Sequence, residues 1–143
     1  MPASDTVSDR AQEIVDEFSL FNDWMGRYEY LIELGDDIPA LPEEHKTDEH
    51  YVHGCQSDVW IRANFDEDER ALHFQGDSNA KITKGLAALV IRVVNEQPPE
   101  AVENADFGFL DDIGLQEHLS SQRNNGLKAM IEEMRERART FRN

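Results

Sequence analysis

The spacing of apolar residues changes along the chain from a helical period to a strand period and back again. In the first forty residues, apolar side chains recur three or four positions apart, which predicts two helices. Polar residues at 4–8 can start the first helix, and Asp23 and Gly35 are expected to cap the start and the end of the second. The apolar positions of these helices are Ile14, Val15, Phe18, Trp24, Tyr28, Leu31 and Ile32.

The middle of the chain follows the period of two that is typical of strands. Pro39 and Pro42, set among charged residues, mark positions 36–50 as a loop. In "SDVWIRANF", residues 57–65, every second side chain from Val59 onward is apolar, and "RALHFQG", residues 70–76, alternates in the same way. The charged "DEDE" between them predicts a turn, so the two runs are expected to pair as a hairpin. A short segment at residues 50–53 is expected to add a third strand.

Helical spacing returns in the second half of the chain. Asp77 or Ser78 is expected to cap a long helix, and Pro98 and Pro99 to end it. Residues 101–115 are expected to form short helical turns, and a last helix carries the apolar stripe Leu127, Met130, Ile131, Met134 and Ala138. This order predicts an α+β fold, in which a small antiparallel sheet of about three strands packs with helices from both the N- and C-terminal segments.

The chain is strongly acidic, and this limits its partners. Its 143 residues contain 30 Asp and Glu against 14 Lys and Arg, a formal net charge of −16. Such a surface repels the phosphates of nucleic acids and anionic membranes, so neither is expected as a partner. The sequence shows no stretch as apolar and long as a membrane span and no signal peptide. The length fits one domain, residues 1–143, in which residues 1 to about 8 are the candidate for disorder.

The sequence contains one cysteine, Cys55. It cannot form an intramolecular disulfide or a Cys-rich metal frame, so a reducing compartment, the cytoplasm, is expected. A lone cysteine is most often a small buried apolar residue. Here the neighbours Gly54, Gln56 and Ser57 place it instead in a connection between two extended segments, where side chains are positioned for access. Gly54 also permits a positive φ or the close approach of another segment.

Four blocks of sequence follow one another between residues 21 and 139: "YLIELGDDIPALP", "GCQSDVW", "QGDSNAKITKGL" and "SSQRNNGLKAM". Together they resemble the SufE family of sulfur-acceptor proteins in iron–sulfur cluster assembly. The resemblance implies that Cys55 takes sulfane sulfur as a persulfide from a cysteine desulfurase of the SufS or CsdA type. It also implies that the chain stimulates this enzyme and passes the sulfur to an iron–sulfur scaffold protein. It implies no permanently bound cofactor and no metal.

The same resemblance suggests roles for residues outside Cys55. Arg123 matches an arginine of the family and is expected to act near the cysteine. Asp77 and Asn79 fall in a block that reads "GDSDA" in the family, beside the cysteine loop, and are expected to contribute to partner binding. Asn79 replaces an aspartate, so a role that needs a charge at this position is in doubt. Gly54, Gln56 and Ser57 are the supporting residues of the cysteine block.

The state of the thiol can also be predicted. The carboxylates of Asp48, Glu49 and Asp58 lie close in sequence and are expected to raise the pKa of the Cys55 thiol. The free protein should therefore react slowly until a partner docks. The SufE resemblance implies the same behaviour, because the thiol of that family is tucked into an apolar cavity and must turn outward for transfer.

Two other classes of function stay open. A Cys-dependent hydrolase or transferase would pair Cys55 with His53, which lies two positions earlier and so on the same side of an extended segment. A pure binding adaptor, in which the cysteine is incidental, is the weaker alternative. A resident metal is not expected, because the histidines show no HxxxH or HxxE spacing.

The composition predicts a response to salt. Lysine is scarce beside ten arginines, occurring at Lys46, Lys81, Lys84 and Lys128. Because salt screens repulsion among surface carboxylates, the melting temperature should rise as KCl is increased from low to molar concentration. Thermal unfolding in a KCl series measures this. A melting temperature that stays constant across the series would refute an adaptation to high salt.

Overall fold

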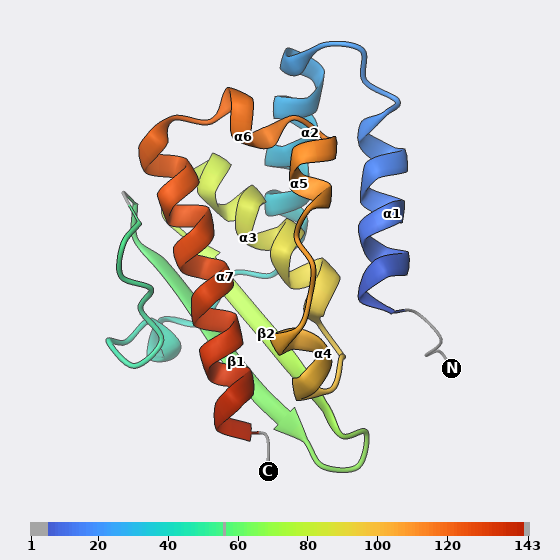
Figure 1. Cartoon of the computed structure of the whole chain (residues 1–143). Helices are drawn as coiled ribbons and strands as arrows, with labels where there is room; N and C mark the ends of the chain where they lie inside the picture. Colours follow the sequence, from blue (N-terminus) through green and yellow to red (C-terminus); the bar gives the residue numbers. More distant parts are fainter. Residues whose placement is uncertain (1–5, 56, 142–143) are drawn as a thin grey trace.

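Helices from both ends of the chain pack with a two-stranded antiparallel sheet in the computed structural model, which describes residues 6–55 and 57–141 (Figure 1). The α+β fold class is thereby confirmed. In chain order the elements are α1 (Val7–Phe18), α2 (Trp24–Asp37), the 3-10 turn η1 (Glu43–His45), β1 (Val59–Asp66), β2 (Ala71–Ser78), α3 (Lys81–Val94), α4 (Pro99–Glu103), α5 (Phe109–Asp112), α6 (Leu115–His118) and α7 (Ser121–Phe141). Within the described residues, the helices are all too short or too polar to cross a membrane.

The first helix starts within the expected range, residues 4–8. The Thr6 side chain accepts a hydrogen bond from the backbone of Asp9, and the Asp9 carboxylate accepts one from the backbone of Thr6. This capping box satisfies N–H groups that the first turn leaves free, so α1 begins at Val7. Of the segment expected to be disordered, residues 6–8 belong to this cap and the first turn of α1, and residues 1–5 lie outside the described part of the chain.

Two glycines let α2 and α3 cross at close range. A Cβ atom on Gly35 would lie 2.7 Å from the backbone nitrogen of Gly85, and one on Gly85 would lie 2.3 Å from the carbonyl oxygen of Leu31. The prediction that Gly35 ends the second helix is wrong, because α2 continues to Asp37 and Ile38 is its C-cap. Gly35 serves the contact between helices, whereas Asp23 caps the start of α2 as expected.

The sheet has two strands, and the expected third strand is only a bridge. β1 and β2 form the predicted hairpin, with Val59 opposite Ser78 at one end and Asp66 opposite Ala71 at the other. The segment before β1 pairs through an isolated bridge between Tyr51 and Trp60. It goes no further because the chain turns at residues 53 and 54, which takes the backbone out of register with β1.

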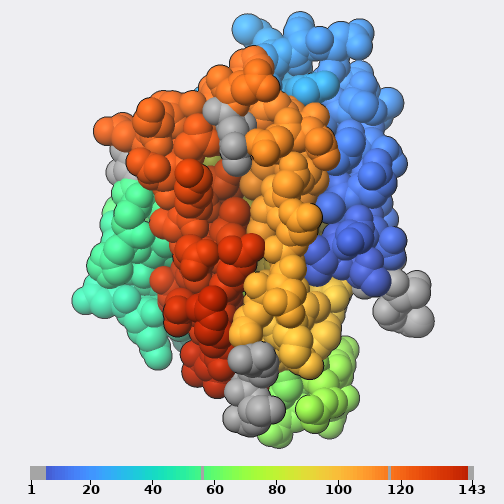
Figure 2. Space-filling view, in the orientation of Figure 1, coloured from blue at the N-terminus to red at the C-terminus, as the bar shows by residue number. Residues whose placement is uncertain are grey.

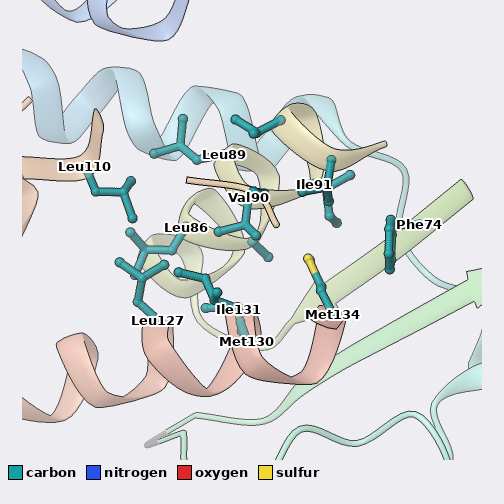
Figure 3. Close-up of a cluster of buried hydrophobic side chains, with 14 of the residues drawn as sticks. Phe74, Leu86, Leu89, Val90, Ile91, Leu110, Leu127, Met130, Ile131 and Met134 are labelled. Carbon is teal, nitrogen blue, oxygen red and sulfur yellow. The ribbon is translucent and has the colours of Figure 1, made fainter. Parts of the chain in front are cut away.

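The core surrounds α3, which packs against α1, α2, β2 and α7 (Figure 3). Figure 3 shows Leu86 and Val90 on the side of α3 that faces Leu127, Met130 and Ile131 of α7, with Phe74 of β2 at one end. All five residues of the predicted stripe on the last helix are buried: Leu127, Met130, Ile131, Met134 and Ala138. This packing fixes α7 against the rest of the molecule. Figure 2 shows α7 running along the surface with the segment that precedes β1 beside it.

Replacing Gly85 by Ala should destabilise the fold by about 3 kcal/mol, because the new methyl group meets the backbone carbonyl of Leu31, which cannot move aside cheaply. Urea denaturation of wild type and variant measures the loss. Gly108→Ala is the matched control, since Gly108 has an ordinary φ of −60° and its nearest obstacle is the end of the Asp106 side chain. Equal effects of the two substitutions would contradict the close helix crossing.

Candidate functional site

Cys55 lies in a loop whose two ends are joined at their base. The backbone nitrogen of Val52 donates to the carbonyl oxygen of Val59 at 2.8 Å. The Tyr51 hydroxyl donates to Oδ1 of Asp58 at 3.0 Å. One contact is made by the backbone and the other by side chains, so entry and exit of the loop stay together whatever the tip does.

The tip of the loop rests on the first turns of α7. The Cys55 Sγ lies 3.5 Å from the carbonyl oxygen of Gly126, as donor to acceptor. Gly54 adopts φ +97°, a left-handed conformation that favours glycine, and a Cβ there would lie 3.4 Å from the Cβ of Ala129. Cys55 is half-buried. The thiol is thus covered by α7 without being sealed inside the core.

Burial raises the pKa of the Cys55 thiol above its ordinary value. The direction agrees with the prediction, but the cause is different. Loss of hydration, rather than repulsion from Asp48, Glu49 or Asp58, makes the thiolate unfavourable. At neutral pH the side chain is therefore a thiol, which suits its place as a hydrogen-bond donor to a carbonyl oxygen.

The other residues of the cysteine block contribute in different ways. Gly54 supplies the left-handed turn, and Ser57 is half-buried in the bend that leads to β1. Gln56 lies outside the described residues. His53 is exposed, and its ring packs edge-on against Tyr51 at a centroid distance of 5.0 Å. The thiol of Cys55 instead turns to α7, so the geometry does not support the Cys55–His53 pair of a hydrolase.

Arg123 lies in the first turn of α7, three residues before Gly126. This spacing places the two on neighbouring parts of one helix face. Its guanidinium donates to the Tyr28 hydroxyl at 3.3 Å, and its backbone nitrogen donates to Oγ of Ser120 at 3.2 Å. The side chain therefore ties the start of α7 to α2, and the helix end that carries the thiol's acceptor is held in place.

Asp77 is buried, with 4% of its surface exposed, and its carboxylate is surrounded by donors. Oδ2 accepts from the backbone of Leu41 at 2.9 Å, and Oδ1 accepts from the backbone of Ser78 at 2.8 Å. The Nζ atoms of Lys84 and Lys46 lie 3.3 Å and 3.6 Å from the carboxylate. These contacts anchor the loop before the cysteine to the end of β2, which favours a structural role over direct contact with a partner.

The expected cap of α3 by Asp77 or Ser78 is not formed. The helix begins at Lys81, and its N-cap, Ala80, has no capping side chain. The Asp77 carboxylate is engaged by Leu41 and the lysines, while Oγ of Ser78 accepts from the backbone of Ala80 at 3.2 Å, outside the helix proper. The Asp77 side chain, which the local sequence predicted as the cap, instead binds residues that are distant in the sequence.

Asn79 is exposed and pairs with Asp58, three residues after the cysteine. The backbone nitrogen of Asp58 donates to Oδ1 of Asn79 at 3.2 Å, and Nδ2 of Asn79 donates to Oδ2 of Asp58 at 3.3 Å. An amide can give and accept these two bonds at once, whereas an ionised aspartate at this position could only accept. The asparagine thus links the start of α3 to the base of the cysteine loop.

Comparison with known proteins identifies the family of the chain. The family model described as "SufE: Fe-S metabolism associated domain" matches residues 12–138. The chain belongs to the SufE family. An uncharacterized SufE-like protein of Rhizobium etli is 42% identical over 130 residues, covering 89% of this chain and 88% of that protein. Another from Rhizobium meliloti is 40% identical over 129 residues, covering 88% and 92%.

A longer plant protein and a solved structure are also similar to this chain. The Arabidopsis thaliana protein named SufE-like protein 1, chloroplastic/mitochondrial, is 41% identical over 131 residues, which cover 90% of this chain and 34% of that longer protein. The solution structure of a hypothetical protein from Thermus thermophilus superposes with a TM-score of 0.75 at 22% identity, covering 92% of this chain and 94% of that one. The latter supports the fold alone. The family places this chain in iron–sulfur metabolism.

Sequence reasoning missed the residues that hold the cysteine loop of this SufE-family chain from other elements. Gly126 receives the thiol, and Arg137 of α7 donates to the carbonyl oxygen of Glu49 at 2.9 Å. The signal for Gly126 was present, because a glycine inside a helical pattern often marks a packing requirement. Arg137 gave no such signal, since an arginine on a charged helix face is ordinary.

The β1–β2 turn gathers three polar side chains that the histidine spacing did not indicate. Ligand-type atoms of Asp66, Glu69 and His73 lie within 4.8 Å of one another. They are engaged with each other and with the turn: Nε2 of His73 lies 2.8 Å from Oε1 of Glu69, and Oδ1 of Asp66 accepts from the backbone of Asp68 at 2.9 Å. The cluster is accounted for by a hydrogen bond and a turn.

Asp77→Ala should lower the free energy of unfolding at pH 7 by about 3 kcal/mol, because it leaves a buried backbone donor and two lysines without their acceptor. Asp77→Asn should cost less, since it keeps an acceptor for Leu41. Urea unfolding measures both, with the exposed Asp36→Asn as control.

The cost of Asp77→Asn should also depend on pH. Burial alone would raise the pKa of Asp77, but hydrogen bonds from Leu41 and Ser78 and the charge of Lys84 outweigh it and lower the pKa. The stabilisation is complete above the unfolded-state pKa, near 3.9, and is lost as the pH falls through the lower folded-state pKa. The difference from wild type should therefore shrink between pH 7 and pH 3. An unchanged difference would argue against an ionic anchor.

Proposed function

We propose that this chain is a sulfur carrier. Cys55 accepts sulfane sulfur as a persulfide from a cysteine desulfurase, and the persulfide is passed to an iron–sulfur scaffold protein. Removal of the persulfide from the desulfurase would stimulate that enzyme. The observation that carries the proposal is the half-buried thiol at the tip of a loop with a closed base, in a member of the SufE family. Such a thiol can be covered at rest and still reach a second protein.

The transfer reaction needs one thiol and no cofactor on this chain. The Cys55 thiol loses its proton, and the thiolate attacks the outer sulfur of the partner's persulfide. A new S–S bond forms on Cys55, the S–S bond of the partner breaks, and the partner cysteine leaves as a thiolate with the electron pair. No net oxidation occurs. A second cysteine in the chain could resolve the persulfide into a disulfide and release sulfide, so the single cysteine of the sequence suits a carrier.

The surface around the thiol is polar and available to a partner. His53, Gly54, Asp58 and Asn79 are exposed on or beside the cysteine loop. A desulfurase that binds this surface would contact Asn79 directly. Asp77 would contribute indirectly, because its buried carboxylate fixes the loop that precedes the cysteine. A reducing compartment such as the cytoplasm completes the proposal, because the thiol must stay reduced between transfers.

The test is to mix the purified chain with a cysteine desulfurase from the same organism and cysteine, and then to measure intact mass. Cys55 should gain about 32 Da, the mass of one sulfur atom, and the desulfurase should turn over faster. Cys55→Ser should show neither effect. His53→Ala is the control, and it should behave as wild type because its ring packs on Tyr51 rather than on the thiol.

Two results would count against the carrier. The absence of added sulfur on Cys55 would remove the transfer step. Full stimulation of the desulfurase by Cys55→Ser would instead indicate an adaptor, for which the cysteine is incidental.

A further inference from the structure

The first turns of α7 meet Cys55 with backbone rather than with a side chain. A Cβ atom placed on Gly126 would lie 3.4 Å from Sγ of Cys55 and 3.6 Å from its Cα and Cβ. These are ordinary van der Waals separations, so a methyl group would just fit. The three nearest atoms all belong to Cys55, so a larger, branched side chain at position 126 would compete with Cys55 for this space.

The contact is also selective for the protonation state. The carbonyl oxygen of Gly126 is an acceptor, and it lies 3.5 Å from Sγ. A thiol can donate its S–H to this oxygen. A thiolate has no proton to donate, so its lone pairs would face those of the carbonyl oxygen in a partly dehydrated place, which is unfavourable.

We propose that Gly126 is a positioning residue that holds Cys55 against α7 as the protonated thiol and releases it as the thiolate. The proposal rests on the sulfur-carrier function and specifies how that function is kept inactive at rest. The docked form cannot attack a persulfide, because it is neither deprotonated nor free of the helix. The nucleophile is formed when the loop tip leaves Gly126, for example when a desulfurase binds the exposed surface of the loop.

The release needs movement of the tip alone. The base of the loop is closed by the Val52–Val59 and Tyr51–Asp58 bonds, and neither involves Cys55 or Gly126. Gly54 gives the tip a residue with wide conformational freedom. The thiol can therefore move away from Gly126 while the strand bridge and the side-chain clamp remain in place.

Charged and titratable groups near the Cys55–Gly126 contact do not offer another explanation for a change in the reactivity of the thiol. On the loop, the Tyr51 hydroxyl interacts electrostatically with Cys55, and both Tyr51 and Asp58 are engaged with one another. On α7, the guanidinium of Arg123 is turned to the Tyr28 hydroxyl. These hydrogen bonds do not involve Gly126, so a change in thiol reactivity on substitution of position 126 reports on the contact between Cys55 and Gly126.

The experiment compares alkylation of Cys55 by iodoacetamide, as a function of pH, in wild type, Gly126→Ala and Gly126→Val. The valine displaces the thiol into water, so its reaction at pH 7 should be about tenfold faster, the change in thiolate fraction that one pKa unit makes, with the midpoint of the pH profile lowered. The alanine should stay within about twofold of wild type. Asn125→Ala, an exposed neighbour on α7, is the matched control and should not change the profile.

Wild-type rate and pH profile in a folded Gly126→Val protein would overturn the proposal. If the valine variant does not fold, the carbonyl carbon of Gly126 in the wild-type protein decides. Its chemical shift should titrate together with Cys55 and be constant in Cys55→Ser, and the absence of this titration overturns the proposal as well. Sulfur uptake, measured by mass spectrometry, is a separate result. A wild-type protein that gains no sulfur would refute the carrier function but not the control of the Cys55 thiol by Gly126.

Discussion

The apolar contact between α7 and α3 is the interaction on which the site depends. Burying a large aliphatic side chain contributes roughly 2 kcal/mol, and α7 places four such side chains in the shared core beside Ala138: Leu127, Met130, Ile131 and Met134. The S–H bond to Gly126 is a weak one, whose net contribution is about 1 kcal/mol or less. The helix is therefore fixed far more strongly than the thiol that rests on it. The tip of the cysteine loop can therefore move away from α7 without disturbing the helix, and the carbonyl oxygen of Gly126 stays in position to accept the thiol again.

The contacts of the cysteine loop and of the segment before it also differ in strength between base and tip. The anchoring contacts involve charged groups or several hydrogen bonds. The Asp77 carboxylate accepts from the backbone of Leu41 and lies beside two lysines, and Arg137 donates to the carbonyl oxygen of Glu49. The Asn79 side chain makes two hydrogen bonds to Asp58. Among the described residues of the tip, the hydrogen bond to α7 is the weak one from the Cys55 thiol to the carbonyl oxygen of Gly126. Local opening follows the weakest contacts, so motion concentrates where the sulfur chemistry requires it. The structure thus separates the part that must be placed accurately from the part that must move.

Sequence patterns predicted what local physics decides. The alternation from Val59 onward gave the hairpin, because period two and a charged turn are properties of adjacent residues. The stripe on α7 gave the core face of that helix for the same reason. Asp23 was correctly predicted as a cap, since it competes for nothing else. Cys55 itself could be singled out from its glycine and polar neighbours.

The wrong predictions share a cause: residues that a local signal assigned to a helix cap instead contact a segment distant in the sequence. Gly35 carries a helix-end signal but is used for the approach of Gly85, fifty positions away. Asp77 carries a capping signal but serves the backbone of Leu41. Gly126 is a poor helix residue by propensity, and its use appears only when the cysteine loop is folded onto α7. Such roles are set by tertiary contacts, which a pattern of neighbouring residues does not contain.

The electrostatics of the thiol likewise depend on tertiary structure rather than on charges that are near in the sequence. Near Cys55 in sequence, carboxylates suggested that repulsion controls the thiol, yet the raised pKa comes from burial. Asp58, the nearest carboxylate, is already engaged by the Tyr51 hydroxyl and the Asn79 amide. Remote surface charges are screened by salt, whereas lost hydration is not. Reactivity controlled by burial can be switched by moving one side chain, and a partner protein can supply that movement at any ionic strength at which it binds.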